Sequence, residues 1–452
     1  MSERAAPLRV AVVGYATDGR ATAAYHAARG DRVEIRDANP ATEVDPSFDR
    51  LLGPDHLSDL DSFDLVVRSS GVHPDKLLAA NPAALGLADK ITTSVNEFVR
   101  HSPSSHLYGV TGTKGKGTTA TLIAELLRAA GRTVHLGGNI GIGMLSLLPL
   151  VGPDDHCVLE LSSFQLFDFT GRVPTAVALS ITPEHLNWHA DLADYQGAKA
   201  RLFAHQAPGD VTVFNARSAT AAAAAAHSPG RRFGFDVPPI GEPPAAREAA
   251  FVDGERLWHG DTMIMDVAEI ALPGRHNLEN VCAAVSATWP EIAGDLDAAR
   301  AVLRRWSGLS EHLELIRETG GVRWYNDTYA TAPDAALAAM RSFDRPKVLI
   351  IGGIDKQVPQ ADFVAAIAAE QSVRGVVLID DLAPQLAELF AGRGYDRAVL
   401  GGDSMDAIVA TAARLAEPGD VVLLSPGAAG NGGMFADKWD RGRRFTAAVA
   451  AL

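Results

Sequence analysis

The segment Gly112 to Thr119, GTKGKGTT, constrains this chain more than any other. The run LYGVTG before it predicts a buried strand, and the Ala- and Leu-rich stretch after it predicts a helix. In a strand–loop–helix unit the glycines let backbone N–H groups approach phosphate oxygens, and a lysine such as Lys116 reaches the β and γ phosphates. The segment therefore predicts an ATP-binding α/β domain. The alternative, a Gly-rich turn with surface lysines, would not require this strand–loop–helix context.

The spacing of this loop differs from the common GxxxxGK[ST] pattern. Gly117 stands where a Ser or Thr usually contacts magnesium, and Thr118 is the nearest replacement. We therefore expect any magnesium contact of the loop to come from Thr118 or from an acidic side chain nearby.

Length and composition indicate several globular domains. A chain of 452 residues exceeds a single core and suggests about three domains. The net charge of -14 argues against a broad basic face for nucleic acid, so nucleic acid is not expected as a partner. Cys157 and Cys282 lie far apart in apolar stretches and are expected to be buried thiols in a reducing compartment. No signal peptide or run of about 18 apolar residues is present, so a cytoplasmic protein with no membrane span is expected.

The first domain is expected over residues 1–104. Its opening run predicts a strand, a turn, a helix and a second strand that ends at Asp37. A further strand, FDLVVRSSGV, ends in Ser69, Ser70 and Gly71. The pattern Gly14-x-x-x-x-Gly19 lacks a full GxGxxG, and packing alone can account for such a turn.

The remaining chain predicts two more α/β domains, over 105–308 and 309–452. A polar linker, HSPSSH, precedes the second domain, where strands alternate with helices and predict a parallel sheet covered on both faces. Residues 219–248 are expected to form surface loops and short strands. The third domain has three βα signals, KVLIIGG, VRGVVLIDD and DVVLLSPG. The fold class is therefore α/β, with a Rossmann-like first domain, a phosphate-loop second domain and a Rossmann-like third domain.

Side chains that suit metal binding follow two predicted strands of the second domain. Glu160 ends the strand in HCVLELSSFQ, where a carboxylate could hold magnesium against the phosphates. The segment ITPEHLNWHADLADYQGAKARLF gathers His185, Asn187, His189 and Lys199. A lone histidine is usually structural, but His185 lies just beyond a strand among ligand-type side chains, which makes a metal role plausible.

Several motifs in order resemble those of the Mur ligases over nearly the whole chain. They are GTKGKGTT, LGGNIG (136–141), LELSSFQL (159–166), ITPEHLNWH, YQGAK ending at Lys199, GRHNLEN (274–280) and WYNDTYAT (324–331). The resemblance implies an ATP-dependent amide ligase that adds D-glutamate to UDP-N-acetylmuramoyl-L-alanine through an acyl phosphate, in peptidoglycan precursor synthesis. L-Glutamate as the added amino acid, or a related ligase with a changed acceptor, stays open. Two alternatives from other functional classes are a regulatory protein that binds nucleotide without catalysis and a P-loop NTPase that drives motion.

The resemblance also implies roles for individual residues. The loop residues Gly112, Thr113, Lys114, Gly115, Lys116, Gly117 and Thr118 would hold ATP, together with Asn277, Asn280, His312 and Asp327. Two magnesium ions would be held by Thr118, Glu160, His185 and a carbamylated Lys199, with Lys116, His185 and Lys199 as catalytic residues. The acceptor would contact Asp37, Ser70, Gly71, Asn139 and Ser162, and glutamate would contact Thr331, Lys356 and Ser425. The protein would act as a monomer.

Three positions depart from the family pattern. His312 stands where an arginine is common, Glu311 stands at the preceding histidine, and Tyr329 replaces a common lysine. Because two permanent positive charges are lost, we expect protonated His312 or Lys114 to substitute for them. The middle of SPGAAGNGGMFADKWDRG is unusually rich in glycine, which leaves L-glutamate as an alternative substrate at this stage.

Overall fold

The computed structural model describes residues 6–139, 143–309, 312–355, 358–430 and 432–452. Its contacts divide the chain into two compact units, Met1–Glu269 with Leu278–Val302, and Ile270–Asn277 with Leu303–Leu452. Across the described residues, no helix combines the length and the apolar character needed to cross a membrane.

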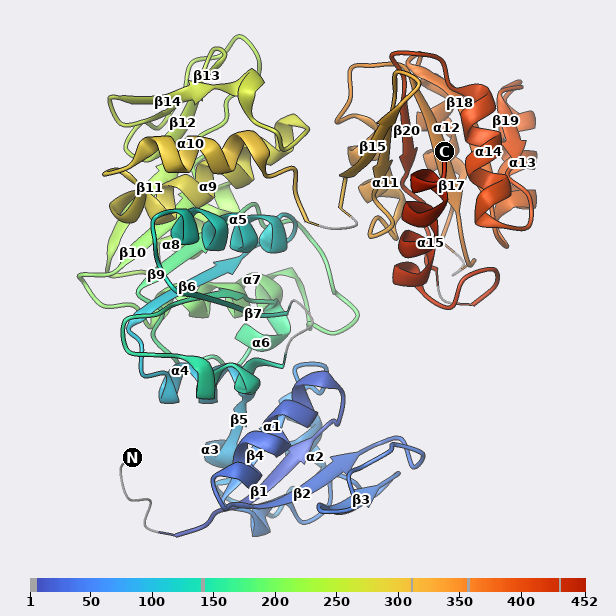
Figure 1. The fold of residues 1–452 in the computed structure, drawn as a ribbon. Coiled ribbons are helices and arrows are strands. Elements are labelled where there is room, and N and C mark those ends of the chain that lie inside the picture. The colour runs from blue at the N-terminus through green and yellow to red at the C-terminus, as the bar shows by residue number, and fades with distance from the viewer. Residues whose placement is uncertain (1–5, 140–142, 310–311, 356–357, 431) are drawn as a thin grey trace. The chain divides into compact units, whose positions relative to one another are not determined.

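The first unit begins with a five-stranded parallel sheet in the order β3-β2-β1-β4-β5, drawn in blue in Figure 1. Alternate residues of β1 enter two different hydrophobic clusters, Val10 and Val12 in one, Ala11 and Val13 in the other. Both faces of the sheet are therefore buried, as parallel sheets require. The strands are β1 (Arg9–Val13), β2 (Arg32–Asp37), β3 (Asp49–Leu52), β4 (Leu65–Arg68) and β5 (Ile91–Thr93). The helices are α1 (Thr17–Ala28), α2 (Pro74–Ala80), α3 (Leu87–Lys90) and α4 (Ser94–His101).

The two glycines of the first βα turn are explained by packing. Gly14 has a φ of +90°, a conformation that favours glycine. A Cβ on Gly19 would lie 2.0 Å from the carbonyl oxygen of Gly14, so α1 could not approach β1 with any larger residue there. The turn therefore needs no dinucleotide to account for it.

A six-stranded parallel sheet follows in the same unit, in the order β11-β10-β9-β6-β8-β7. This agrees with the alternation of strands and helices in the sequence. Both cysteines are buried free thiols, as expected. The strands are β6 (His106–Thr111), β7 (Val134–Gly138), β8 (His156–Glu160), β9 (Thr175–Ala178), β10 (Val211–Asn215) and β11 (Arg231–Phe235). The helices are α5 (Lys116–Ala129), α6 (Ser163–Leu166), α7 (Leu192–Ala204) and α8 (Ala219–Ala225).

Two features of the region after β10 differ from expectation. Residues 219–248 begin with the helix α8, because the Ser218 hydroxyl caps the N–H of Ala221 and a run of alanines follows. A three-stranded antiparallel sheet, β12 (Ala250–Asp253), β13 (Arg256–His259) and β14 (Thr262–Asp266), was not predicted. Its turns at Gly254 and Gly260 have positive φ and were the signals available for it. The helices α9 (Arg275–Ile292) and α10 (Leu296–Arg305) come next.

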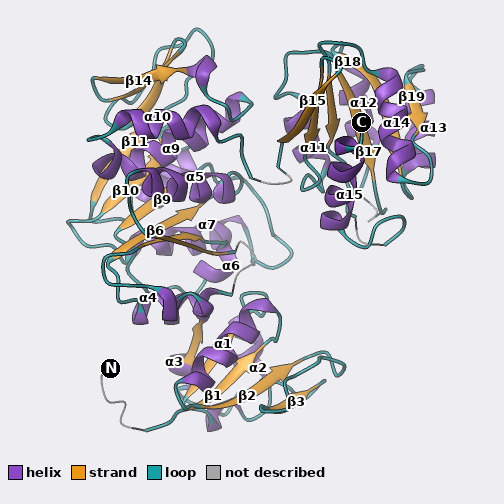
Figure 2. Ribbon diagram, viewed as in Figure 1, coloured by secondary structure: helices purple, strands orange, loops and turns teal. Residues whose placement is uncertain are grey.

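The second unit contains a six-stranded sheet in the order β15-β16-β20-β17-β18-β19, with only β15 antiparallel to its neighbour. Leu349 and Ile351 of β17 enter a cluster with α11, α12 and α13, whereas Val348 and Ile350 enter one with α14 and α15. Helices accordingly cover both faces (Figure 2). The strands are β15 (Glu314–Thr319), β16 (Val322–Asn326), β17 (Lys347–Gly352), β18 (Val373–Ile379), β19 (Ala398–Leu400) and β20 (Val421–Leu424). The helices are α11 (Pro333–Met340), α12 (Ala361–Ala369), α13 (Ala383–Ala391), α14 (Met405–Leu415) and α15 (Lys438–Ala450).

Candidate nucleotide and substrate site

The segment predicted to bind phosphate lies between β6 and α5, in the strand–loop–helix context that the sequence predicted. Gly112 has a φ of +152°, and a Cβ there would lie 2.6 Å from the Cβ of Leu179. Gly115 has a φ of +81°, and a Cβ there would lie 2.2 Å from Oδ1 of Asn280. Both glycines are thus required by the close approach of the Leu179 and Asn280 side chains, and the loop leads into the N-terminus of α5, the kind of position that binds anions.

The two lysines of the loop have different surroundings. The Lys116 Nζ donates a hydrogen bond to the carbonyl oxygen of Thr113 at 2.9 Å, so its side chain folds back over the loop. Burial lowers the pKa of Lys116, although the carboxylates of Glu160 and Glu184 oppose this effect. The Lys114 side chain is 72% exposed and pairs with Oε1 of Glu184 at 2.6 Å. Lys116 is therefore the more enclosed of the two lysines of the loop, and its role in phosphate binding stays a prediction.

Glu160 ends β8 and is buried beside the loop. Burial raises the pKa of Glu160, while Lys116, the Asn139 side chain and Lys199 act in the opposite direction. The β7–β8 register pairs Gly138 with Glu160, and a Cβ on Gly138 would lie 2.1 Å from the Glu160 carbonyl oxygen. The Asn139 N–H donates to that same oxygen at 2.9 Å, so the glycines of LGGNIG bring Asn139 to this acid.

Lys199 reaches the loop from α7. Its Nζ donates to the carbonyl oxygen of Gly112 at 2.8 Å and lies 4.7 Å from the centre of the Tyr195 ring. The side chain is buried, and this burial, with a further contribution from Lys116, lowers the pKa of Lys199 to about 7. A large share of Lys199 is therefore a neutral amine near neutral pH. The structure brings Lys116, Glu160 and Lys199 together from three separate motifs.

The two histidines of ITPEHLNWH differ in exposure. His185 is in the left-handed region, with a φ of +58°, and its Nε2 lies 3.6 Å from Oε2 of Glu184. His189 is 2% exposed, and its ring nitrogens contact Oδ2 of Asp194 at 2.9 Å and Oγ of Ser163 at 3.0 Å. His189 is therefore a structural residue, and His185, whose side chain is 44% exposed, is the accessible one. Asn187 is exposed.

The sequence reasoning did not single out Glu184 and Tyr195. Glu184 pairs with Lys114 and faces His185, so it links the loop to the histidine segment. The Tyr195 hydroxyl contacts the Thr113 hydroxyl at 2.9 Å and fixes the loop from α7. Glu184 lies beside His185 in a segment already identified, so its acidic charge was the signal available. Tyr195 is the first residue of the YQGAK motif, and this position was the sequence signal that could have identified it.

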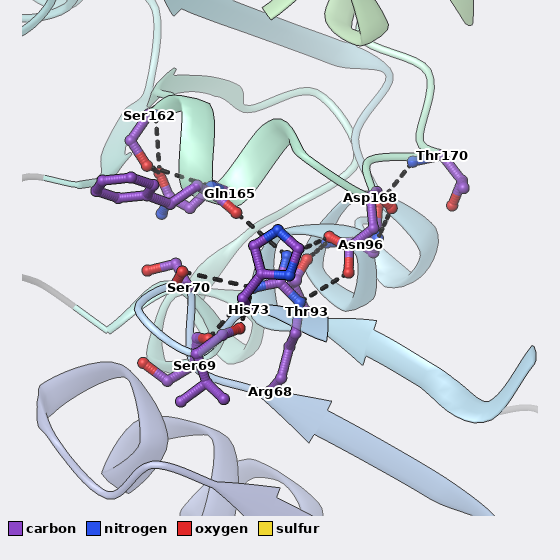
Figure 3. Close-up of polar contacts among 12 residues, drawn as sticks. Arg68, Ser69, Ser70, His73, Thr93, Asn96, Ser162, Gln165, Asp168 and Thr170 are labelled. Atoms are coloured by element: carbon purple, nitrogen blue, oxygen red, sulfur yellow. Dashed lines mark hydrogen bonds and ion pairs between the residues drawn. The ribbon is translucent and has the colours of Figure 1, made fainter. Parts of the chain in front are cut away.

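The predicted acceptor residues lie at the carboxyl edge of the first sheet and at α6. The Asp37 carboxylate accepts hydrogen bonds from the N–H of Tyr15 and of Asn39. Burial acts to raise the pKa of Asp37, but these bonds outweigh it and the pKa lies below its usual value. The carbonyl oxygen of Gly71 accepts from Nε1 of Trp188 at 3.3 Å. Ser162 caps α6 in a capping box with Gln165 (Figure 3), and the carbonyl oxygen of Ser70 accepts from Nη1 of Arg68 at 3.5 Å.

In the second unit, Asp327 and Ser425 meet at the ends of β16 and β20. The Ser425 hydroxyl donates to Oδ2 of Asp327 at 2.7 Å, and the Leu313 N–H donates to Oδ1 at 3.2 Å. Burial raises the pKa of Asp327 to about 7. Asn277, in the first turn of α9, donates to the Pro273 carbonyl oxygen at 2.6 Å.

The departures from the family pattern form a stack in this unit. The rings of His312 and Tyr329 lie 4.0 Å apart, and the Lys438 Nζ lies 3.3 Å from the centre of the Tyr329 ring. A cation thus lies on the ring of Tyr329, the position at which the resemblance led us to expect a lysine. Thr331 is exposed. Lys356 and Glu311 lie outside the described residues.

No group of three or more His, Cys, Asp or Glu side chains suited to a metal occurs in the part of the chain that the structure describes. Glu160 and His185 are the two residues of these types among the predicted metal ligands. The roles of all the predicted site residues therefore stay predictions, although many of them do meet in space.

A phosphate loop that faces a buried acid and a buried lysine at the edge of a parallel sheet defines an α/β nucleotide-binding protein. The description "Mur ligase middle domain" matches residues 110–288, and "Mur ligase, glutamate ligase domain" matches residues 313–428. The UDP-N-acetylmuramoylalanine–D-glutamate ligase of Symbiobacterium thermophilum is 37% identical over 98% of this chain and 98% of its own length. The ligase of the same name from Pelotomaculum thermopropionicum is 34% identical with the same coverage. The chain therefore belongs to the Mur ligase family.

Solved structures agree on the fold. The UDP-N-acetylmuramate–alanine ligase MurC of Thermotoga maritima has a TM-score of 0.59 at 16% identity, covering 98% of this chain and 99% of its own. MurF of Acinetobacter baumannii has a TM-score of 0.61 at 16% identity, covering 98% and 93%. MurF of Thermotoga maritima, solved in complex with ADP, has a TM-score of 0.59 at 18% identity, covering 98% and 94%. These likenesses extend the α/β description to nearly the whole chain.

Proposed function

We propose that this protein joins D-glutamate to UDP-N-acetylmuramoyl-L-alanine in an ATP-dependent reaction of peptidoglycan precursor synthesis. The observation that carries the proposal is the meeting of Lys116, Glu160 and Lys199 at the phosphate loop. Relatives that span nearly the whole chain are named as ligases of this kind. The same names favour D-glutamate over the L-glutamate alternative.

The reaction would start when the carboxylate of the acceptor's alanine attacks the γ-phosphorus of ATP. A P–O bond forms to the carboxylate, the bond to the β-phosphate oxygen breaks, and an acyl phosphate and ADP result. Lys116 and the N–H groups at the start of α5 would bind the phosphate oxygens on which charge collects. The unprotonated amine of glutamate would then attack the acyl carbon, releasing inorganic phosphate and a proton and forming the amide.

The residues present fit one magnesium ion without change. Mg²⁺ takes oxygen ligands and is commonly held by one or two carboxylates together with substrate phosphates. The buried carboxylate of Glu160 and the hydroxyl of Thr118, in the first turn of α5, supply such oxygens. The ion would neutralise charge on the transferred phosphoryl group.

A second ion, at His185 and Lys199, would require a change in Lys199. An amine that donates to a carbonyl oxygen offers no oxygen ligand, whereas a carbamate would. The burial that lowers the pKa of Lys199 to about 7 leaves the neutral amine that attacks carbon dioxide, with loss of one proton. We therefore propose that Lys199 is carbamylated in the working enzyme.

This modification can be tested by ¹³C NMR under ¹³C-bicarbonate. We expect a carbamate resonance in the wild-type protein that is absent from Lys199→Arg, and a loss of ligase activity in that variant. Because the neutral amine is needed, the signal should weaken as the pH falls below about 7. A wild-type protein with full activity and no such resonance would overturn the proposal.

The finer assignments follow from this function. The first sheet, with Asp37 and the Ser69–Gly71 loop, would hold the UDP end, and the second unit would receive glutamate near Thr331, Lys356 and Ser425. We propose that the three large sheets mark three domains, over 1–104, 105–308 and 309–452. We also propose that the protein is a cytoplasmic monomer.

The direct test is phosphate release measured in an omission series. Release is expected only when ATP, UDP-N-acetylmuramoyl-L-alanine and glutamate are all present. Phosphate release that does not depend on the acceptor would instead indicate a simple NTPase.

A further inference from the structure

Arg68 is the last residue of β4 and directly precedes the Ser69–Gly71 loop. Its side chain has no exposed surface. A charged guanidinium is rarely buried so completely unless most of its N–H groups are paired, because desolvation of an unpaired charge costs several kcal/mol. The hydrogen-bond partners of this guanidinium therefore indicate the role of Arg68.

One side of the guanidinium binds the segment around α6. Its Nε donates to Oδ2 of Asp168 at 2.8 Å and its Nη2 to Oδ1 at 2.6 Å, a bidentate pair (Figure 3). The Nη2 group also donates to the carbonyl oxygen of Phe164 at 3.2 Å. Asp168 is itself held by α4, because the Asn96 side chain donates to its carbonyl oxygen at 3.0 Å.

The other side of the guanidinium binds the loop. Its Nη1 donates to the carbonyl oxygens of Ser69 at 3.3 Å, Ser70 at 3.5 Å and Val72 at 3.0 Å. Carbonyl oxygens repel anions, and here they turn toward Arg68. A loop whose carbonyls are held on one side can present its N–H groups to a phosphate on the other.

Trp188, which lies in the segment ITPEHLNWH together with His185, holds the same Ser69–Gly71 loop. Its indole N–H donates to the Gly71 carbonyl oxygen at 3.3 Å, and its ring lies 4.5 Å from that of His73. His73 in turn lies 4.6 Å from Phe167, which belongs to the α6 segment. The loop is thus held both from the α6 segment, whose N-cap is Ser162, and from the segment that carries His185.

We propose that Arg68 and Trp188 are positioning residues, with Arg68 acting through Asp168. Together they fix the Ser69–Gly71 loop, which would bind the acceptor's diphosphate, against α6 and the segment that carries His185. The inference rests on the proposed function, since it takes the Ser69–Gly71 loop as the site of the UDP diphosphate. A lysine at position 68 would keep the charge but would lose the planar fork that joins Asp168 to three carbonyl oxygens. The position of the alanine carboxylate relative to the bound diphosphate would then be less well defined.

The test compares Arg68→Lys with Arg172→Lys in the full-length protein. Arg172 is a matched control, because it binds Asp210 with the same bidentate contacts of 2.8 and 2.6 Å but is 56% exposed. For Arg68→Lys we expect the KM for UDP-N-acetylmuramoyl-L-alanine to rise about tenfold, with the KM for ATP changed by less than about twofold. Arg172→Lys should change neither value.

A second variant covers the case in which Arg68→Lys fails to fold. Trp188→Phe keeps a ring beside His73 but removes the N–H bond to Gly71, and should raise the acceptor KM about threefold. An unchanged acceptor KM in both variants, or an equal rise in all KM values, would overturn the proposal.

Calorimetric binding of the acceptor without ATP separates this inference from the proposed function. If the wild-type protein binds the acceptor but forms no amide, the proposed function fails, and weaker binding by Arg68→Lys still supports the positioning role. Equal binding by wild type and Arg68→Lys would contradict that role whether or not amide forms.

Discussion

Both units gather polar side chains at the carboxyl ends of parallel strands, but they supply charge there in different ways. In the first unit Lys116 and Lys199 lie with Glu160 around one loop, so basic and acidic groups with shifted pKa values are gathered there. In the second unit the acid Asp327 is buried with Ser425, and the cation Lys438 lies on the ring of Tyr329. The first arrangement joins residues of the predicted motifs, whereas in the second the cation comes from the first residue of α15.

The difference teaches where substitutions can be tolerated. At Gly112 and Gly115 of the phosphate loop, the close approach of the Leu179 and Asn280 side chains leaves no room for a Cβ, so larger residues cannot replace these glycines. Near Asp327, by contrast, the ring of Tyr329 contacts the side chains of His312, from the loop before β15, and of Lys438, from α15.

The largest expected effect is at Lys116. Lys116→Met should lower kcat/KM by about a thousandfold, because the charge on the transferred phosphoryl group would lose its partner inside the loop. Steady-state kinetics of amide formation measure this. Lys76→Met, at an exposed position on α2, is the control and should retain wild-type kinetics. Retention of more than about a tenth of the activity by Lys116→Met would remove the loop from the centre of the mechanism.

The next effect concerns Asp327 and stability. Burial raises the pKa of Asp327 to about 7, so its neutral form is favoured in the folded state. Its contribution to stability is complete below the ordinary pKa of aspartate, near 4, and is lost as the pH rises through about 7. Within that window the free energy of unfolding should fall by at most about 1.4 kcal/mol per pH unit from this group.

Asp327→Asn has no such titration. Its melting temperature should therefore rise relative to wild type between pH 4 and pH 7, as measured by scanning calorimetry. Asp344→Asn, at an exposed position in the same unit, should show no such trend. Parallel curves for wild type and Asp327→Asn would show that folding does not raise the pKa of this acid.

A smaller effect is expected at Lys438. Lys438→Met should raise the KM for glutamate or ATP about tenfold if its ammonium replaces the lysine that Tyr329 displaced. The double variant Tyr329→Lys with Lys438→Met should recover most of the loss. Arg443→Met, an exposed neighbour on α15, is the control. Failure of the double variant to improve on the single one would mean that the stack is only structural.

Much of the fold could be predicted because its signals are local. The strand before Gly112, the helix after it and the three βα signals of the last domain follow from short apolar runs. The antiparallel sheet β12–β14 was missed because its strands are short and the surrounding sequence offered only two turn glycines. Glu160 was predicted from its position at the end of a strand, and the resemblance to the Mur ligases added roles for Lys199 and Asp327.

The remaining site residues depend on tertiary contacts that no local pattern contains. Arg68 ends an ordinary strand, and its role becomes visible only when Asp168 is brought beside it. Lys438 is similar, since nothing in the sequence places it on Tyr329. His189 shows the converse, because its motif suggests a ligand whereas Asp194 and Ser163 occupy both ring nitrogens.

The central claim is that the phosphate loop presents ATP to the acceptor's carboxylate. The most direct measurement follows ¹⁸O from the carboxylate of UDP-N-acetylmuramoyl-L-alanine during amide formation with D-glutamate. An acyl phosphate requires that an ¹⁸O atom appear in the released inorganic phosphate, as detected by mass spectrometry. Phosphate that contains no ¹⁸O, although amide is formed, would contradict the account.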